Sequence, residues 1–158
     1  MILKHPMPES ELAPLKRLIV ERACEQLSIE YARAVDFRDY ERFVDLFADD
    51  ALLDLGMRLE GKDAIRASML MRSDEIRTRH VLTNIFIEVH DSQHAHGISY
   101  LTLYRHVGVQ STKPGPVPSI LPTAVGHYED SFIRTDAGWR FQTRTLHVAF
   151  RNPDTVKS

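Results

Sequence analysis

Asp36 is the first residue in this sequence whose type and position suggest chemistry. It ends an amphipathic segment, and Tyr31 lies five residues before it. Two interpretations are open: Asp36 can cap the next helix, with Asp39 imitating a capping box, or it can be an acid that points into a pocket. Spacing alone favours the cap, because five residues rotate an ideal helix by about 140° and so separate Tyr31 from Asp36.

His80, at the start of a predicted strand, is the second candidate. A lone histidine in such a place is typical of a surface or hydrogen-bonded side chain. A carboxylate bonded to one ring nitrogen would change this, because it fixes the tautomer and makes the other nitrogen a better base. That nitrogen can remove a proton next to a carbonyl, while a tyrosine hydroxyl donates to the developing oxyanion.

Histidines also gather in "HDSQHAH", residues 90–96. Imidazole and carboxylate suit zinc, nickel or iron. However, this segment is a predicted exposed hairpin turn, where polar residues are expected anyway, so we predict no metal site and no cofactor. Core or interface positions are expected for His127 and His147, and a solvated strand face for Arg134, Arg140 and Arg144.

The first half of the chain predicts three helices. Ser10 offers a cap for the first, over residues 11–34, and the others are expected at residues 39–50 and 62–75. The first helix carries an apolar stripe with one residue in every four. Its members are Leu15, Ile19, Ala23, Leu27 and Tyr31.

From residue 78 onwards the apolar period changes from 3.6 to 2. Strands are expected at residues 78–89, 94–107, 124–135 and 139–150, after one or two short strands with a turn near 51–61. The proline-rich segment 111–123 cannot lie inside a sheet and is a long loop. Strict alternation would place one set of residues on a single face of the first long strand. These are Val81, Thr83, Ile85, Ile87 and Val89.

Separate blocks of helices and strands are typical of an α+β fold. A curved, mostly antiparallel sheet wrapped around the N-terminal helices would leave a small-molecule pocket between the two. The outer strand faces are too apolar to remain wet, so we expect a homo-oligomer, a dimer or trimer, that buries them.

Length, composition and charge limit the number of domains and the kinds of partner that this protein is expected to have. The 158 residues suggest one domain, over residues 10–150, with flexible termini at 1–9 and 151–158. A net charge of −2 and the absence of a long basic run argue against nucleic acid and anionic membranes. No membrane-spanning or secretory segment is visible, which predicts a cytoplasmic protein. The one cysteine, Cys24, is expected to be a small buried side chain.

Four segments together resemble a known family. "YARAVDFRDYERFVDLFADDA", "GKDAIRASM", "TRHVLTNIFIEV" and "GHYEDSFIRTDAGWRF" stand in the order and spacing of the SnoaL-like (polyketide-cyclase-like) branch of the nuclear-transport-factor-two-like superfamily. The similarity covers roughly residues 15–150 and implies a cone-shaped, cystatin-like α+β barrel. Relatives include scytalone and bile-acid dehydratases, ketosteroid isomerase and a dehydrochlorinase. Small subunits of ring-hydroxylating dioxygenases share the fold without being catalytic.

The resemblance also implies roles for individual residues. Dehydratase-type members have an Asp at the end of the first helix and a His at the start of the first long strand, and Asp36 and His80 match them. Tyr31 matches the tyrosine of the bile-acid dehydratase type. The resemblance therefore implies that Asp36 polarises His80 beside Tyr31 in one cavity. Polar residues from the second long strand are not clearly matched. Candidates for substrate binding are Asn84, Tyr100, Tyr104 and His106.

These observations predict a metal-free, cofactor-free lyase or isomerase. Its substrate would be a small, mostly apolar ring compound of the polyketide, steroid or aromatic class. Three alternatives stay open: a ligand-binding module without turnover, the non-catalytic small subunit of an oxygenase, and a polyketide cyclase in which Asp36 or another acid works without His80.

Overall fold

The computed structural model describes residues 13–118 and 121–153. The helices of this part are α1 (Pro14–Asp36), α2 (Tyr40–Asp45), α3 (Gly61–Leu70) and the short 3₁₀ helix η1 (Val109–Thr112). The strands are β1 (Phe47–Asp54), β2 (Arg58–Glu60), β3 (Ile76–Val89), β4 (His94–Val107), β5 (Ala124–Thr135) and β6 (Gly138–Arg151). The predicted loose arm at residues 1–9 and the Ser10 cap lie outside the described residues, as does most of the predicted flexible tail.

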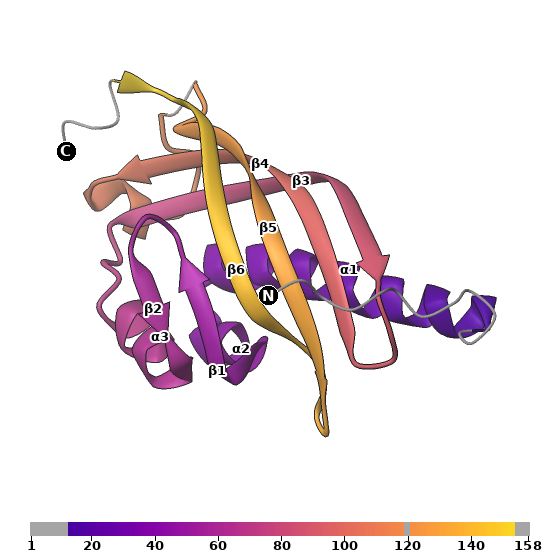
Figure 1. Ribbon diagram of the computed structural model, residues 1–158. Helices are drawn as coiled ribbons and strands as arrows, with labels where there is room; N and C mark the ends of the chain where they lie inside the picture. Colours follow the sequence, from indigo (N-terminus) through magenta and orange to yellow (C-terminus); the bar gives the residue numbers. More distant parts are fainter. Residues whose placement is uncertain (1–12, 119–120, 154–158) are drawn as a thin grey trace.

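All six strands form one sheet in the order β2-β1-β6-β5-β4-β3. β1 runs parallel to β6, and every other neighbouring pair is antiparallel. The sheet is strongly curved, it does not close, and the helices lie on its concave side (Figure 1). The predicted α+β architecture is therefore confirmed, with the difference that β1 and β2 extend the sheet beyond the four long strands.

The core fills the space between the helices and the concave face. Its largest members are aromatic, and the buried rings stack in tilted or edge-on pairs with centroids about 5–6 Å apart. These rings belong to Tyr31, Phe43, Phe47, Tyr128, Phe132 and Phe141. The interior of the cone is therefore lined mainly by carbon, and any polar group inside it is far from water.

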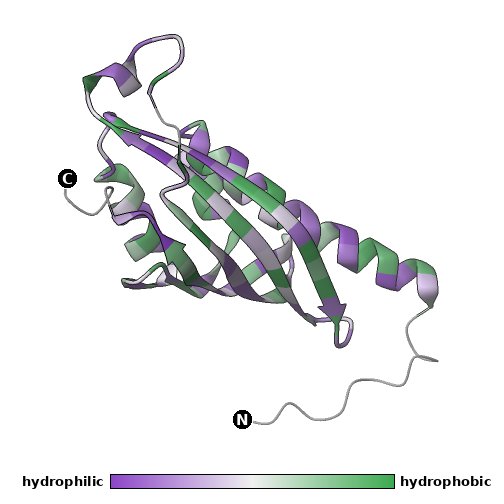
Figure 2. Ribbon diagram, turned by 90° about the horizontal axis from the view of Figure 1, so that it is seen from above, coloured by the Kyte–Doolittle hydropathy of each residue, from purple (hydrophilic) through white to green (hydrophobic). Residues whose placement is uncertain are grey.

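Helix α1 begins at Pro14, a residue that suits the first helical position because its missing N–H would be unpaired there anyway. Leu27 and Tyr31 of the predicted stripe are buried, and Ala23 packs against the core. Leu15 and Ile19 were wrongly assigned to it, since they are 68% and 58% exposed. The reason is geometric: the first turns of α1 project beyond the edge of the sheet (Figure 2).

The predicted second helix is too long. α2 ends at Asp45, and β1 begins at Phe47, which pairs with Phe141 of β6. The helical pattern of residues 46–50 is overridden because strand pairing buries Phe47 completely. The predicted third helix also ends early, at Leu70.

Strand β3 contains a β-bulge that breaks its alternation. Thr83 pairs with Tyr100, and the next recorded partners are Phe86 and Ile98, so β3 has one residue more than β4 there. Asn84 sits in this bulge with φ of 49°, a left-handed conformation that asparagine tolerates. The prediction of one continuous apolar face was therefore wrong. Val81 and Thr83 point outward, whereas Ile87 packs against the core and Val89 is buried.

None of the helices in the described part of the chain is long and apolar enough to cross a membrane.

Candidate functional site

Asp36 is the last residue of α1, and it does not cap α2. The cap is Asp39, whose carboxylate accepts a hydrogen bond from the backbone N–H of Arg42 at 3.3 Å. The side chain of Asp36 is only 5% exposed and points toward β3. The question left open by the spacing is thus answered in favour of an inward-pointing acid.

The carboxylate of Asp36 contacts two residues at the start of β3. Its Oδ1 lies 2.7 Å from Nδ1 of His80 and accepts the hydroxyl of Thr78 at 2.8 Å. Its Oδ2 accepts the backbone N–H of His80, also at 2.8 Å. Both the ring and the backbone of His80 are therefore held by one acid, at the junction between α1 and the sheet.

This arrangement determines which nitrogen of His80 keeps a free lone pair. Burial alone would raise the pKa of Asp36, but the hydrogen bonds from His80 and Thr78 outweigh it and hold that pKa below its usual value. An ionised Asp36 accepts a hydrogen bond from Nδ1–H, and Nε2 is left with its lone pair free. The side chain of His80 is 10% exposed, so this nitrogen is largely screened from bulk water.

Arg72 supports the pair from behind. Its guanidinium donates to the Thr78 hydroxyl at 2.9 Å and to the backbone carbonyl of Val35 at 2.8 Å. Because the hydroxyl accepts from Arg72, its own hydrogen is directed at Asp36. Arg72 thereby ties the end of α1 to β3 and fixes the position of the acid.

Tyr31 lies deeper in the cone. It is 2% exposed, and its ring stands edge-on to the His80 ring with centroids 6.3 Å apart. Burial raises the pKa of Tyr31, so the hydroxyl is neutral and remains a donor. The structure thus brings Tyr31 and the Asp36–His80 pair into one interior, although α1 is continuous to Asp36, because Asp36 reaches β3 from the helix end.

A buried arginine completes this interior. The guanidinium carbon of Arg144 lies 3.9 Å from the ring centroid of Tyr128, 4.1 Å from that of Tyr31 and 4.6 Å from that of Phe141. Arg144 has no exposed surface. Stacking on aromatic faces stabilises a guanidinium by cation–π attraction, and more strongly away from water.

Arg144 is not fully paired. Its Nη2 donates to the Ser99 hydroxyl at 3.3 Å, and its Nε lies 3.5 Å from Oδ1 of Asp130. Within the described residues, Nε and Nη1 of Arg144 and Oδ1 of Asp130 have no hydrogen-bond partner. Burial raises the pKa of Asp130 to about 6, against the pull of Arg144. The cone therefore contains a buried cation whose hydrogen-bonding capacity is not filled by the described residues.

Arg144 was predicted to lie on a solvated strand face, and this prediction was wrong, because its side chain is fully buried. Ser131 pairs with Thr143 and Phe132 pairs with Phe141, so Gln142 is an extra residue in β6. This bulge reverses the alternation after Phe141 and turns Arg144 inward. A regular strand would have directed it outward, and the local sequence carried no signal of the bulge.

The predicted substrate-binding residues divide between two places. Asn84 lines a cleft of about 620 Å³ between α1 and β3, together with His80, Ile29 and Leu82. This cleft leads to the catalytic candidate from the open edge of the sheet.

Tyr100, Tyr104 and His106 are not brought to the site. They alternate with Leu101, which is buried, and Leu103, which packs against the core, so they point to the convex face. Tyr100 is 52% exposed, and His106 bonds to the Ser111 hydroxyl at 2.7 Å. The structure therefore contradicts a shared pocket for these three residues and His80.

A family model described as "SnoaL-like domain" matches residues 16–145, which include Asp36, His80 and Arg144. The chain belongs to the SnoaL-like family. The resemblance seen in the sequence is thereby confirmed. A search of curated proteins gives no match to this sequence.

Solved structures of similar proteins share the SnoaL-like fold. A hexachlorocyclohexane dehydrochlorinase (LinA) Type2 is 21% identical, with a TM-score of 0.74, over 89% of this chain and 93% of that one. A proposed scytalone dehydratase from Novosphingobium aromaticivorans is 23% identical, with a TM-score of 0.72, over 86% and 88%. A proposed aromatic ring hydroxylase from the same organism is 24% identical, with a TM-score of 0.69, over 89% and 98%. At these identities the likeness shows the fold.

Proposed function

We propose that this SnoaL-like protein is a cofactor-independent lyase or isomerase that acts on a small, mostly apolar ring compound. The observation that carries the proposal is the 2.7 Å contact between Asp36 and His80 inside the cone. A buried carboxylate that holds an imidazole by one nitrogen is the arrangement that a general base requires.

The reaction would begin at a carbon next to a carbonyl group. Nε2 of His80 takes the proton, and the electron pair of the C–H bond moves into the carbonyl to give an enolate. Asp36 stabilises the imidazolium that forms. In a lyase, the enolate then expels a hydroxide or halide from the β-carbon, and hydroxide leaves as water with the proton of the imidazolium. In an isomerase, the imidazolium returns the proton to a different carbon.

The enolate oxygen would be stabilised from the far wall of the cone. Within the described residues, two buried N–H-bearing nitrogens of Arg144 have no hydrogen-bond partner. The guanidinium lies over the ring of Tyr31, whose hydroxyl is neutral and can donate as well. Preorganised donors of this kind lower the barrier most where water is excluded. The aromatic core supports the proposal of an apolar ring as the substrate.

The names of two similar structures, a dehydrochlorinase and a proposed scytalone dehydratase, both describe eliminations. They support a lyase over an isomerase. A third similar structure is named as a proposed aromatic ring hydroxylase. This name supports a second candidate function, the small subunit of an oxygenase, which would have the same cone and no catalytic activity. A polyketide cyclase that uses Asp36 without His80 is a third.

Exchange of hydrogen for deuterium tests the first step without knowledge of the substrate. A panel of cyclic ketones with and without a β-hydroxyl or β-chloro group is incubated in D₂O and followed by NMR. The wild type should label or consume at least one member, and His80→Ala should not. His94→Ala, at the exposed start of β4, is the matched control and should behave as the wild type. Activity that survives in His80→Ala would leave the cyclase as the better candidate, and wild-type inactivity on every member would favour the binding module.

We also propose that the protein is a homo-oligomer that covers the convex face of the sheet. Phe86 is 65% exposed on that face, and Ile98, Tyr100 and Val81 are exposed near it. Multi-angle light scattering should give a dimer or trimer, and Phe86→Glu should shift it toward the monomer. A wild-type monomer at micromolar concentration would contradict the proposal.

A further inference from the structure

Three potential metal ligands meet on the convex face of β5 and β6. His127 and Glu129 lie on β5, and His147 lies directly opposite His127 on β6. The two imidazole rings stack with centroids 5.0 Å apart. The carboxylate of Glu129 reaches both, with Oε1 3.4 Å from Nε2 of His127 and Oε2 3.6 Å from Nε2 of His147.

This cluster is separate from the proposed catalytic interior. On the same two strands, the residues that face the cone include Tyr128, Asp130 and Arg144, and all three are buried. The side chains of His127, Glu129 and His147 are between about a third and three-fifths exposed. The sheet lies between the two sets, so an ion bound outside does not touch the reacting groups.

The geometry suits a transition-metal ion. One donor atom from each of the three residues can be chosen so that all lie within 4.8 Å of one another. A zinc ion with ligands at about 2.0–2.2 Å needs its donors roughly 3.3 Å apart, so the most distant pair must close by up to about 1.5 Å. Half-exposed side chains on a rigid pair of strands can do this by small rotations. The ion pairs that the structure gives Glu129 are to these same histidines.

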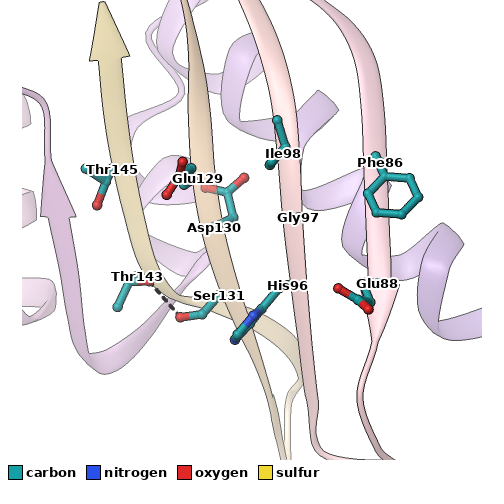
Figure 3. A pocket seen from close by; sticks show the side chains of 10 residues that line it. All are labelled: Phe86, Glu88, His96, Gly97, Ile98, Glu129, Asp130, Ser131, Thr143 and Thr145. Atoms are coloured by element: carbon teal, nitrogen blue, oxygen red, sulfur yellow. Dashed lines mark hydrogen bonds between the residues drawn. The ribbon is translucent and has the colours of Figure 1, made fainter. Parts of the chain in front are cut away.

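We propose that His127, Glu129 and His147 bind one divalent transition-metal ion, with zinc(II) as the preferred probe. Two imidazoles and one carboxylate are a borderline-soft set that selects zinc, copper, nickel or cobalt over magnesium and calcium. Three protein ligands leave a coordination position for water or a small ligand. The position opens beside a groove of about 500 Å³ on the same face, which Glu129 lines together with Phe86, Ile98 and Thr145 (Figure 3).

Zinc titration into chelator-stripped protein, followed by calorimetry and a competing indicator dye, tests the site. The wild type should bind one zinc ion per chain in the low micromolar range. His127→Ala, His147→Ala and Glu129→Gln should each weaken binding by about tenfold or more, since even outer-sphere partners of a metal contribute that much. Affinity should fall as the solution is acidified, because an imidazole must be neutral to ligate a metal.

Two control variants separate this site from other histidines. His94→Ala removes the imidazole that lies beside Asp91, which is another place where zinc could bind. His80→Ala removes the imidazole inside the cone. Both variants should bind zinc as the wild type does. Circular dichroism and the Tm establish that each variant is folded, and Glu129→Gln serves if a histidine variant is not. Wild-type affinity only in the millimolar range, or equal binding by His127→Ala and the wild type, would overturn the proposal, as would loss of binding in His94→Ala or His80→Ala.

Discussion

On the inner face of β5 and β6, Asp130 and Arg144 are fully covered, whereas His127, Glu129 and His147 stand at the outer surface of the same strands. Both faces carry an acid close to a basic group. Inside, burial changes the groups themselves: the pKa of Asp130 rises to about 6, and Arg144 is stacked among three rings. Outside, water and salt screen the same kind of interaction. The inner face is therefore suited to stabilising charge that develops during a reaction, and the outer face to binding an ion or another chain.

The largest expected effect comes from changes to His80, the proposed base, and to its partner Asp36. His80→Ala should abolish turnover, because no proton acceptor remains at Nε2. Asp36→Asn should reduce kcat by about three to four orders of magnitude while the fold is kept, because an amide can hold the wrong tautomer and cannot stabilise imidazolium. Steady-state kinetics with circular dichroism as the fold control measures both. An Asp36→Asn enzyme within tenfold of the wild type would show that the pair is structural only.

Removal of the inner cation should affect both stability and rate. Arg144→Met leaves the Asp130 carboxyl buried without its partner, which costs on the order of 3–5 kcal/mol in the free energy of unfolding. The rate should fall about 10²–10³-fold, the scale of one lost oxyanion donor.

The double variant Asp130→Asn/Arg144→Met separates these two effects. Urea denaturation should show most of the stability restored, since no unpaired charge remains, while the rate stays low. If the double variant recovers the rate as well, Arg144 acts through the fold and not on the oxyanion.

Two tyrosines give a matched pair across the sheet. Tyr31→Phe removes an inner hydroxyl and should lower kcat by about ten- to a thousandfold. Tyr100→Phe makes the same chemical change on the convex face and should leave kcat within about twofold, because its ring lies outside the cone. Parallel kinetic assays on one substrate make the comparison, and equal losses in the two variants would show that the division between faces is wrong.

The pH dependence of the free energy of unfolding tests the buried acids of the inner face. The raised pKa of Asp130 means that the folded state binds a proton between about pH 4 and 6 that the unfolded chain has released, so its contribution to stability falls as pH rises. The lowered pKa of Asp36 has the opposite sign, and its contribution is lost as pH falls through the usual range of an aspartate. Asp130→Asn should therefore flatten the decline from pH 4 to 6 by on the order of 2 kcal/mol. Urea denaturation at several pH values measures this, and an unchanged slope would contradict it.

Much of the fold was predictable because long-range pattern determines it. The change of apolar period near Thr78 predicted the four long strands, and the helix block before it predicted the concave layer. The predictions that failed concern local features of single strands. Phe47 reads as helical and becomes a strand residue because β6 pairs with it. The bulges at Asn84 and Gln142 each reverse a strand's alternation, and a single sequence shows neither.

The candidate site was predictable to the same degree. Asp36, His80 and Tyr31 came from the family resemblance, since spacing alone favoured a cap, and the predicted contact between Asp36 and His80 is present. Their catalytic roles stay a prediction. Arg144 was missed because its inward direction depends on the bulge at Gln142. Tyr100, Tyr104 and His106 were chosen by residue type, and the parity of β4 places them outside.

The protonation state of His80 tests the central claim most directly. Nitrogen-15 NMR of the imidazole rings, with His80 assigned by comparison with His80→Gln, reports which ring nitrogen carries the proton. With Asp36 accepting at 2.7 Å, neutral His80 should carry its proton on Nδ1 and leave Nε2 bare at neutral pH. Asp36→Asn should shift the tautomer population toward Nε2–H. A wild-type spectrum with the proton on Nε2 would contradict the account, because the nitrogen that faces the substrate would then have no lone pair with which to act as the base.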